Sequence, residues 1–231
     1  MTRPHCYGID TLDLQVVEEF LPGRLIVLEG TDGVGRTTQI QLLRPWLESL
    51  GYAVIDTEMT HSILAGEGIK EAKAGHALGP ITMQLFYATD FVDRLEQQVL
   101  PALRAGFIVL IDRYIYTLMA RALVRGADAG WLKSIYGLAL KPDAIFYLHL
   151  GIEDLIPRVL QRGGFNYWES GMDMRLGPDL YESFVIYQKR ILHEFEQMSR
   201  VYQFHVIDAR LQVEEICALL KHEIHSLLAN N

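Results

Sequence analysis

The stretch Leu25–Thr38 reads LIVLEGTDGVGRTT and indicates the fold of the whole chain. Its first four residues are apolar, as in a buried strand, and a glycine-rich turn follows them. The residues from about 36 to 50 then have the spacing of a helix. A buried strand, a glycine-rich turn and a helix start, in this order, are typical of a loop that binds phosphate groups.

The turn itself has the spacing G-x-x-x-x-G-[K/R]-T from Gly30 to Thr37. Glycine allows positive φ, so consecutive backbone N–H groups can face one anion, and the helix N-terminus adds its partial positive charge there. The hydroxyl of Thr37 suits a Mg²⁺ ion that bridges the phosphates of ATP. We therefore predict that ATP is bound by nine residues, namely Gly30, Thr31, Asp32, Gly33, Val34, Gly35, Arg36, Thr37 and Thr38.

Arg36 stands where such loops have lysine. Its planar guanidinium is wider than an ammonium group, although it is still a cation and can bind two phosphate oxygens at once. Two alternatives stay open: an active phosphotransferase in which Arg36 takes over the role of lysine, or a catalytically silent nucleotide-binding protein.

Short apolar runs alternate with longer helical patterns along the rest of the chain, which predicts a parallel sheet covered by helices. The expected strands are residues 25–29, 52–56, 107–112, 144–150 and 204–208, each covered on both faces. The expected helices are about 36–50, 81–104, 115–140, 153–162, 179–202 and 212–228. Residues 1–22 are interpreted as an N-terminal extension and 23–231 as a single domain.

Two further groups of polar residues point to phosphate chemistry. Asp112 and Arg113 end the third expected strand, where a carboxylate can anchor Mg²⁺ and the arginine can meet an incoming phosphate. Arg158 and Arg162 lie one helical turn apart, just before the glycine-rich stretch 163–178. We expect residues of about 153–178 to form a lid that brings these arginines to the transferred phosphoryl group.

The net charge of −8, from 21 basic and 29 acidic residues, argues against general binding to nucleic acids or anionic membranes. Cys6 and Cys217 have no partner spacing and are interpreted as free thiols, with a bridge left open. The chain has no signal-peptide pattern and no apolar run that spans a bilayer, so we expect a cytoplasmic protein.

Five segments together resemble the thymidylate kinases: LIVLEGTDGVGRTTQ, QLFYATD, LPALRAGFIVLIDRYIYT, KPDAIFYLHL and the closing VIDA, in the family's order. The resemblance runs from Leu25 nearly to the C-terminus. It implies an α/β fold of the P-loop NTPase type, a three-layer sandwich with a five-stranded parallel sheet and a small lid. It also implies ATP- and Mg²⁺-dependent phosphorylation of dTMP to dTDP, and commonly a homodimer.

The resemblance also assigns roles to individual positions. It implies catalytic roles for Arg36, Asp112, Arg113, Arg158 and Arg162, and metal binding by Thr37 and Asp112. It implies an acceptor site made by Asp32, Phe86, Arg113, Tyr114, Thr117 and Arg121, with Phe86 stacked on the base.

The departures from the family pattern gather on the acceptor side. The segment 58–62 reads Glu-Met-Thr-His-Ser where the family has Arg-Glu-Pro-Gly-Gly, and Phe91 replaces an arginine that reads the base. Leu118 replaces a small polar residue and Arg121 replaces a tyrosine near the sugar. A different nucleotide or a small phosphorylated molecule therefore remains an alternative acceptor. A GTPase is not expected, because its guanine-reading Asn/Thr-Lys-x-Asp motif is missing.

Overall fold

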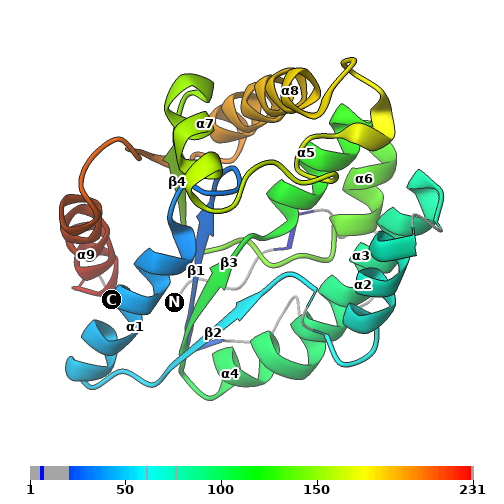
Figure 1. Cartoon of the computed structure of the whole chain (residues 1–231). Coiled ribbons are helices and arrows are strands. Elements are labelled where there is room, and N and C mark those ends of the chain that lie inside the picture. Colours follow the sequence, from blue (N-terminus) through cyan, green and yellow to red (C-terminus); the bar gives the residue numbers. More distant parts are fainter. Residues whose placement is uncertain (1–5, 8–20, 61, 76–77, 230–231) are drawn as a thin grey trace.

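The computed structural model describes residues 6–7, 21–60, 62–75 and 78–229, and contains a five-stranded, all-parallel sheet (Figure 1). The strands are β1 (Arg24–Glu29), β2 (Val54–Glu58), β3 (Ile108–Asp112), β4 (Ala144–His149) and β5 (His205–Asp208). Their order across the sheet is β2-β3-β1-β4-β5. The predicted parallel α/β fold is confirmed, and β1 lies at its centre between β3 and β4.

The strands differ in burial according to their place in the sheet. The central strands β1, β3 and β4 are buried almost throughout, because helices cover both of their faces. The edge strands β2 and β5 leave part of one face to solvent, with Asp56 and Val206 exposed. Our expectation of five strands covered on both faces was therefore wrong for the two edges.

The helices follow the predicted pattern with three differences. They are α1 (Arg36–Ser49), α2 (Gly66–Gly75), α3 (Pro80–Arg94), α4 (Leu100–Arg104), α5 (Ile115–Val124), α6 (Ala129–Tyr136), α7 (Ile152–Gln161), α8 (Leu180–Val201) and α9 (Val213–Ala229). Helix α2 was not predicted, because its glycines weaken the helical pattern. The expected helix 115–140 is two helices, since Gly126 has φ +85° and Asp128 caps a new start. A π-helical turn, Leu95–Val99, joins α3 to α4 just before Pro101.

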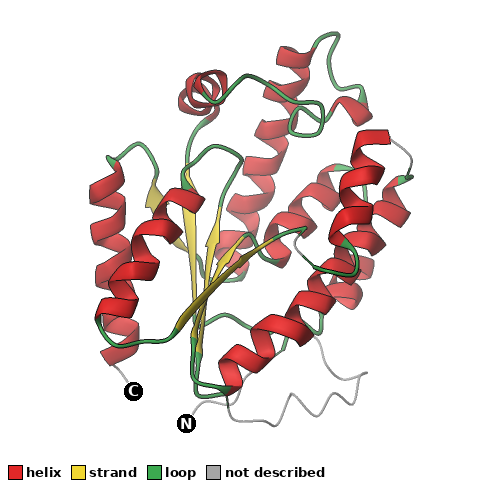
Figure 2. Cartoon of the chain, turned by 60° about the horizontal axis from the view of Figure 1, so that its bottom comes forward, coloured by secondary structure: helices red, strands yellow, loops and turns green. Residues whose placement is uncertain are grey.

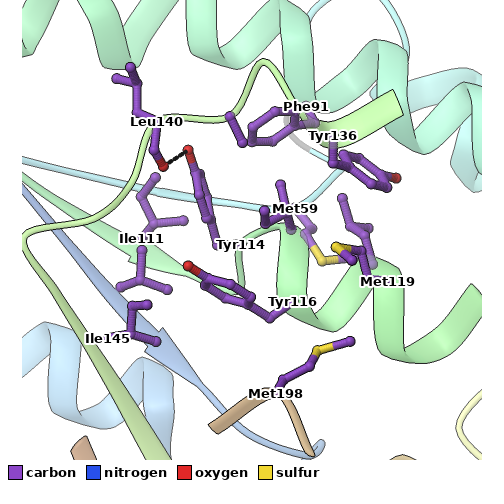
Figure 3. Packing of buried hydrophobic residues seen from close by; sticks show 14 of the residues in the cluster. Met59, Phe91, Ile111, Tyr114, Tyr116, Met119, Tyr136, Leu140, Ile145 and Met198 are labelled. Atoms are coloured by element: carbon purple, nitrogen blue, oxygen red, sulfur yellow. Dashed lines mark hydrogen bonds between the residues drawn. The ribbon is translucent and has the colours of Figure 1, made fainter. Parts of the chain in front are cut away.

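Helices lie on both sides of the sheet (Figure 2). A hydrophobic core fills the space between the sheet and the helices on each side. Alternate residues of β1 enter different cores, with Ile26 on the face covered by α1 and α9 and Val27 on the face covered by α5 and α8. Figure 3 shows the second core, in which Phe91, Tyr114 and Tyr136 meet edge to face. This packing fixes the carboxyl ends of β1 and β3 beside each other.

Most of the N-terminal extension 1–22 lies outside the described residues. Of the described part, Cys6 forms a β-bridge with Leu140. Cys6 and Cys217 are both free thiols. Among the helices that the structure describes, none has the length and apolar character needed to cross a membrane.

Candidate active site

The glycine-rich loop Gly30–Gly35 leaves the carboxyl end of β1 and leads directly into α1. Gly33 and Gly35 have φ of +88° and +98°, which side-chain-bearing residues rarely adopt. Gly35 is the N-cap of α1 and has no side chain to occupy the helix N-terminus. The loop thus keeps the geometry of an anion site, with backbone N–H groups and a helix N-terminus at one place.

Arg36 is directed into the protein and not toward the open side of the loop. Its Nε donates to Asp112 Oδ1 at 2.6 Å, and its Nη1 donates to the carbonyl oxygens of Gly30 and Thr31. The side chain is 5% exposed and that of Asp112 is 8% exposed. This differs from our expectation that Arg36 spans phosphate oxygens, because the guanidinium reaches three acceptors that lie beneath the loop.

The residues expected to hold Mg²⁺ lie together. Thr37 Oγ1 donates to Asp112 Oδ2 at 2.7 Å, so a hydroxyl from α1 and a carboxylate from β3 face the same point. Hard oxygen donors of this kind fit Mg²⁺, which usually takes one or two protein ligands and completes its shell with phosphates and water. The described residues contain no group of three or more His, Cys, Asp or Glu side chains that could hold a metal ion.

Asp32, inside the loop, is the meeting point of two arginines. Arg113, directly after β3, contacts Asp32 Oδ1 through Nη2, and Arg121 from α5 donates to Asp32 Oδ2 at 2.6 Å. The two arginine side chains are 21% and 22% exposed, so solvent reaches this cluster. Burial lowers the pKa of Arg113 to about 9 and the charge of Arg121 adds to this effect, which leaves Arg113 a cation at neutral pH. Two cations that share one carboxylate form a place where an added anion is favoured.

A small recess lies beside this cluster, and helix α8 supplies residues that we did not predict. Its lining includes Asp32, Thr117 and Arg121, together with Tyr187 and Gln188 of α8. Three buried polar atoms here have no hydrogen-bond partner among the residues that the structure describes: Thr31 Oγ1, Arg113 Nε and Gln188 Oε1. Buried polar atoms normally have partners, so their presence at one place fits a site that a polar ligand completes. Nothing in the helical pattern of α8 distinguishes Tyr187 or Gln188 from core residues.

The stretch 163–178, which we call the lid segment because it belongs to the expected lid 153–178, is held by several elements. Arg125 of α5 donates to Asp173 at 2.8 Å, and Gln188 of α8 donates to the carbonyl of Glu169 at 2.7 Å. The indole of Trp168 donates to the carbonyl of Lys73 in α2 at 3.2 Å. The segment therefore connects α2 with α5 and α8.

The two arginines of α7 have different surroundings. A Cβ added to Gly33 would lie 4.0 Å from Nη1 of Arg162, so Arg162 stands over the glycine-rich loop. Its Nη2 donates to Glu169 of the lid segment at 2.5 Å. Arg158 instead donates to the carbonyl of Ala209, beyond β5, at 2.6 Å. We expected both at the transferred phosphoryl group, and the structure brings only Arg162 to the loop.

Three residues expected at the acceptor have other contacts here. The ring of Tyr114 is in the core and its hydroxyl donates to the carbonyl of Leu140 (Figure 3), so an acceptor contact by this side chain was a wrong expectation. Thr117 lines the recess, but its hydroxyl donates to Glu29. Phe86 is half-buried and packs against Gly68 of α2, at the edge of the site region.

The segment after β2, where the sequence departs most from the thymidylate kinase pattern, is held by a buried carboxylate. Asp90 accepts from the backbone N–H groups of Thr60 and Ser62 and pairs with Arg94 at 3.0 Å. Phe91, which replaces the base-reading arginine, is a core residue. His61 lies outside the described residues.

Comparison with known proteins identifies the family of this chain. The family model Thymidylate kinase matches residues 28–219. A probable thymidylate kinase 2 of Saccharolobus solfataricus is 38% identical over 179 residues, covering 77% of this chain and 84% of that protein. A probable thymidylate kinase of Pyrococcus horikoshii is 28% identical over 219 residues, covering 89% and 99%. A thymidylate kinase of Brachyspira hyodysenteriae is 28% identical over 199 residues, covering 85% and 91%. The extent of the family match and the 38% identity show that the chain belongs to the thymidylate kinase family.

Proposed function

We propose that this protein transfers the γ-phosphoryl group of ATP to dTMP and so produces dTDP. The observation that carries this proposal is the meeting of a glycine-rich anion loop with the Asp32–Arg113–Arg121 cluster at the carboxyl edge of one sheet. A phosphate donor and a phosphate acceptor need two adjacent anion sites, and the edge supplies both. The family relatives named thymidylate kinase support dTMP as the acceptor.

On the donor side, the backbone N–H groups of Gly30–Thr38 bind the phosphates of ATP. Thr37 and Asp112 would hold Mg²⁺, which would neutralise negative charge on the phosphates of ATP. Arg162 stands over the same loop and adds a positive charge on the open side. The lid segment excludes water from the phosphoryl group, which strengthens each of these interactions.

On the acceptor side, Arg113 binds the phosphate of dTMP. Asp32 holds Arg113 and Arg121 ready in the free protein and accepts a sugar hydroxyl when the phosphate draws the arginines away. The attacking oxygen of a monophosphate is already anionic, so no side chain has to remove a proton. Catalysis then depends on alignment of the two substrates and on stabilisation of charge.

A panel of nucleoside monophosphates tests this function. ATP consumption is measured with Mg²⁺ and each of dTMP, dUMP, dCMP, dAMP and dGMP, and dTMP should give the highest kcat/KM. Thr37→Ala should weaken binding of MgATP in calorimetry and leave binding of dTMP unchanged. If the protein prefers another monophosphate, that nucleotide and not dTMP is the acceptor. Nucleotide binding without transfer to any acceptor would identify a silent homologue.

We also propose that the protein forms a homodimer and that it is cytoplasmic. Ile63, Leu64, Ile81 and Leu85 are large apolar side chains that are exposed around α2 and the start of α3. Exposed apolar residues in such a group favour an interface, and a twofold axis would bury the same face of both copies. Ultracentrifugation of the wild type and of Ile81→Glu tests this, because a charge at the interface should yield monomers. We place the enzyme in the cytoplasm, where its substrate ATP is made and used.

A further inference from the structure

Glu29, the last residue of β1, is a buried charged residue that the proposed reaction does not use. Its side chain is inaccessible to solvent, although it directly precedes the glycine-rich loop. Its Oε1 accepts from the backbone N–H groups of Tyr114 at 2.8 Å and Thr117 at 3.3 Å, and its Oε2 accepts from Thr117 Oγ1 at 2.5 Å. Burial of a carboxylate is costly, so three hydrogen bonds to one turn indicate a definite task.

That task concerns the start of helix α5. The N-cap residue of α5 is Tyr114, and its side chain makes no capping hydrogen bond. The first N–H groups of a helix need acceptors from outside the helix. Glu29 supplies them from a neighbouring strand, since it binds the N–H groups of the N-cap residue and of the third helical residue. It acts as a cap that comes from β1 and not from α5 itself.

Glu29 also constrains Arg113, which directly precedes the N-cap residue of α5. Arg113 has φ +69°, a left-handed conformation that costs about 1 kcal/mol or more for a residue with a side chain. Its own N–H donates to the carbonyl of Leu28 at 3.0 Å, and the N–H of the next residue donates to Glu29. Leu28 and Glu29 thus hold the backbone on both sides of Arg113. This strained turn directs the guanidinium toward Asp32.

From this geometry we infer that Glu29 is a positioning residue, which holds the turn Asp112–Thr117 so that Arg113 reaches the acceptor phosphate. The inference rests on the proposed function, because it assigns the acceptor phosphate to Arg113. If so, β1 leads into the donor loop and also fixes the position of Arg113, the main cation of the acceptor site. Burial raises the pKa of Glu29, while the hydrogen bonds from Thr117 and Tyr114 and the charge of Arg36 lower it, which agrees with a carboxylate retained at this cost for its contacts.

Three substitutions of Glu29 separate its shape from its charge. Glu29→Gln keeps an oxygen for the two N–H groups and an amide for Thr117 Oγ1, so both KM values should stay within about threefold of the wild type. Glu29→Leu removes every acceptor, and Glu29→Asp draws the oxygens back by one carbon–carbon bond. Both should raise the KM for dTMP about tenfold or more and lower kcat, because a small displacement of a binding group has large effects. The KM for MgATP should stay within about threefold.

Asp143 provides a matched control, because it binds the other end of β1. It also accepts a backbone N–H of β1, that of Leu25 at 2.7 Å, and it lies away from the site. Asp143→Leu should lower the melting temperature without changing either KM. If Glu29→Leu does not fold, Glu29→Asp carries the same test.

The possible outcomes are distinct. Equal rises in both KM values, a change in melting temperature alone, or a Glu29→Gln protein as impaired as Glu29→Asp would overturn the inference while leaving the proposed function intact. A wild type that neither phosphorylates nor binds dTMP would overturn the proposed function, and the inference with it.

Discussion

Two carboxylates beside the glycine-rich loop bind arginines in different ways. Asp112 has one arginine, Arg36, and both side chains are less than a tenth exposed. Asp32 has two, Arg113 and Arg121, and both of these are about a fifth exposed. The first pair is closed and its arginine also bonds to the loop's own carbonyls. The second cluster is open and has more positive than negative charge. On this difference we assign Arg36 to the support of the loop, and we propose Arg113 and Arg121 for the ligand.

The largest expected effect comes from breaking the closed pair. Arg36→Met leaves Asp112 buried without its counter-charge, which should lower the free energy of unfolding by about 3–5 kcal/mol and nearly abolish turnover. Urea denaturation and a coupled assay measure the two quantities. Arg36→Lys is the control: it keeps a cation, should lose less stability, and should retain or raise kcat because the shorter ammonium is free to reach the phosphates. A fully stable Arg36→Met protein would show that the pair does not support the loop.

Removal of the main cation from the open cluster should affect binding more than stability. Arg113→Ala deletes charge-assisted hydrogen bonds to the acceptor phosphate and should raise the KM for dTMP about 100-fold, with the KM for MgATP within about threefold. Steady-state kinetics with each substrate varied in turn measures both values. An equal rise in the two KM values would assign Arg113 to the binding of ATP. It would then contradict the distinction that we draw between Asp112 and Asp32.

A smaller effect is expected from the second arginine of the open cluster. Arg121→Ala leaves Asp32 paired with Arg113, so the KM for dTMP should rise only about tenfold. Arg121→Gln, which keeps an N–H donor of similar reach, should fall between the wild type and Arg121→Ala. The same kinetic assay applies, and a dTMP affinity unaffected by Arg121→Ala would assign Arg121 to structure alone.

The smallest effect concerns Glu29, the buried carboxylate at the end of β1. Its pKa is raised on folding, mainly by burial, so the folded protein binds its proton more tightly than the unfolded chain. The stability that this group contributes should therefore fall as pH rises above the ordinary glutamate pKa, and Glu29→Gln should remove that pH dependence. Urea denaturation at several pH values compares the two proteins, and parallel profiles would contradict the assignment.

Some features of the site follow from local sequence. The strand Leu25–Glu29, the glycine spacing and Thr37 predict the loop, because a buried strand and positive φ values each demand particular residue types at neighbouring positions. The position of Asp112 and Arg113 at a strand end also predicts that they meet the loop, since parallel strands end at one edge.

The remaining features depend on tertiary contacts. The inward direction of Arg36 follows from three acceptors, Asp112 Oδ1 and the carbonyls of Gly30 and Thr31, that only the folded loop brings together. The core position of Tyr114 follows from the left-handed turn at Arg113, which rotates the next side chain inward.

By itself, the sequence determined the α/β fold, the phosphate loop and the family, because periodicity and motif spacing are local properties of the chain. The tertiary structure decided that Arg36 is buried against Asp112, while Arg113 and Arg121 share Asp32 and stay partly exposed. It also decided that a carboxylate on β1 caps a helix about 85 residues further along. Burial and hydrogen bonding between distant segments set these roles, and no pattern within one segment records them.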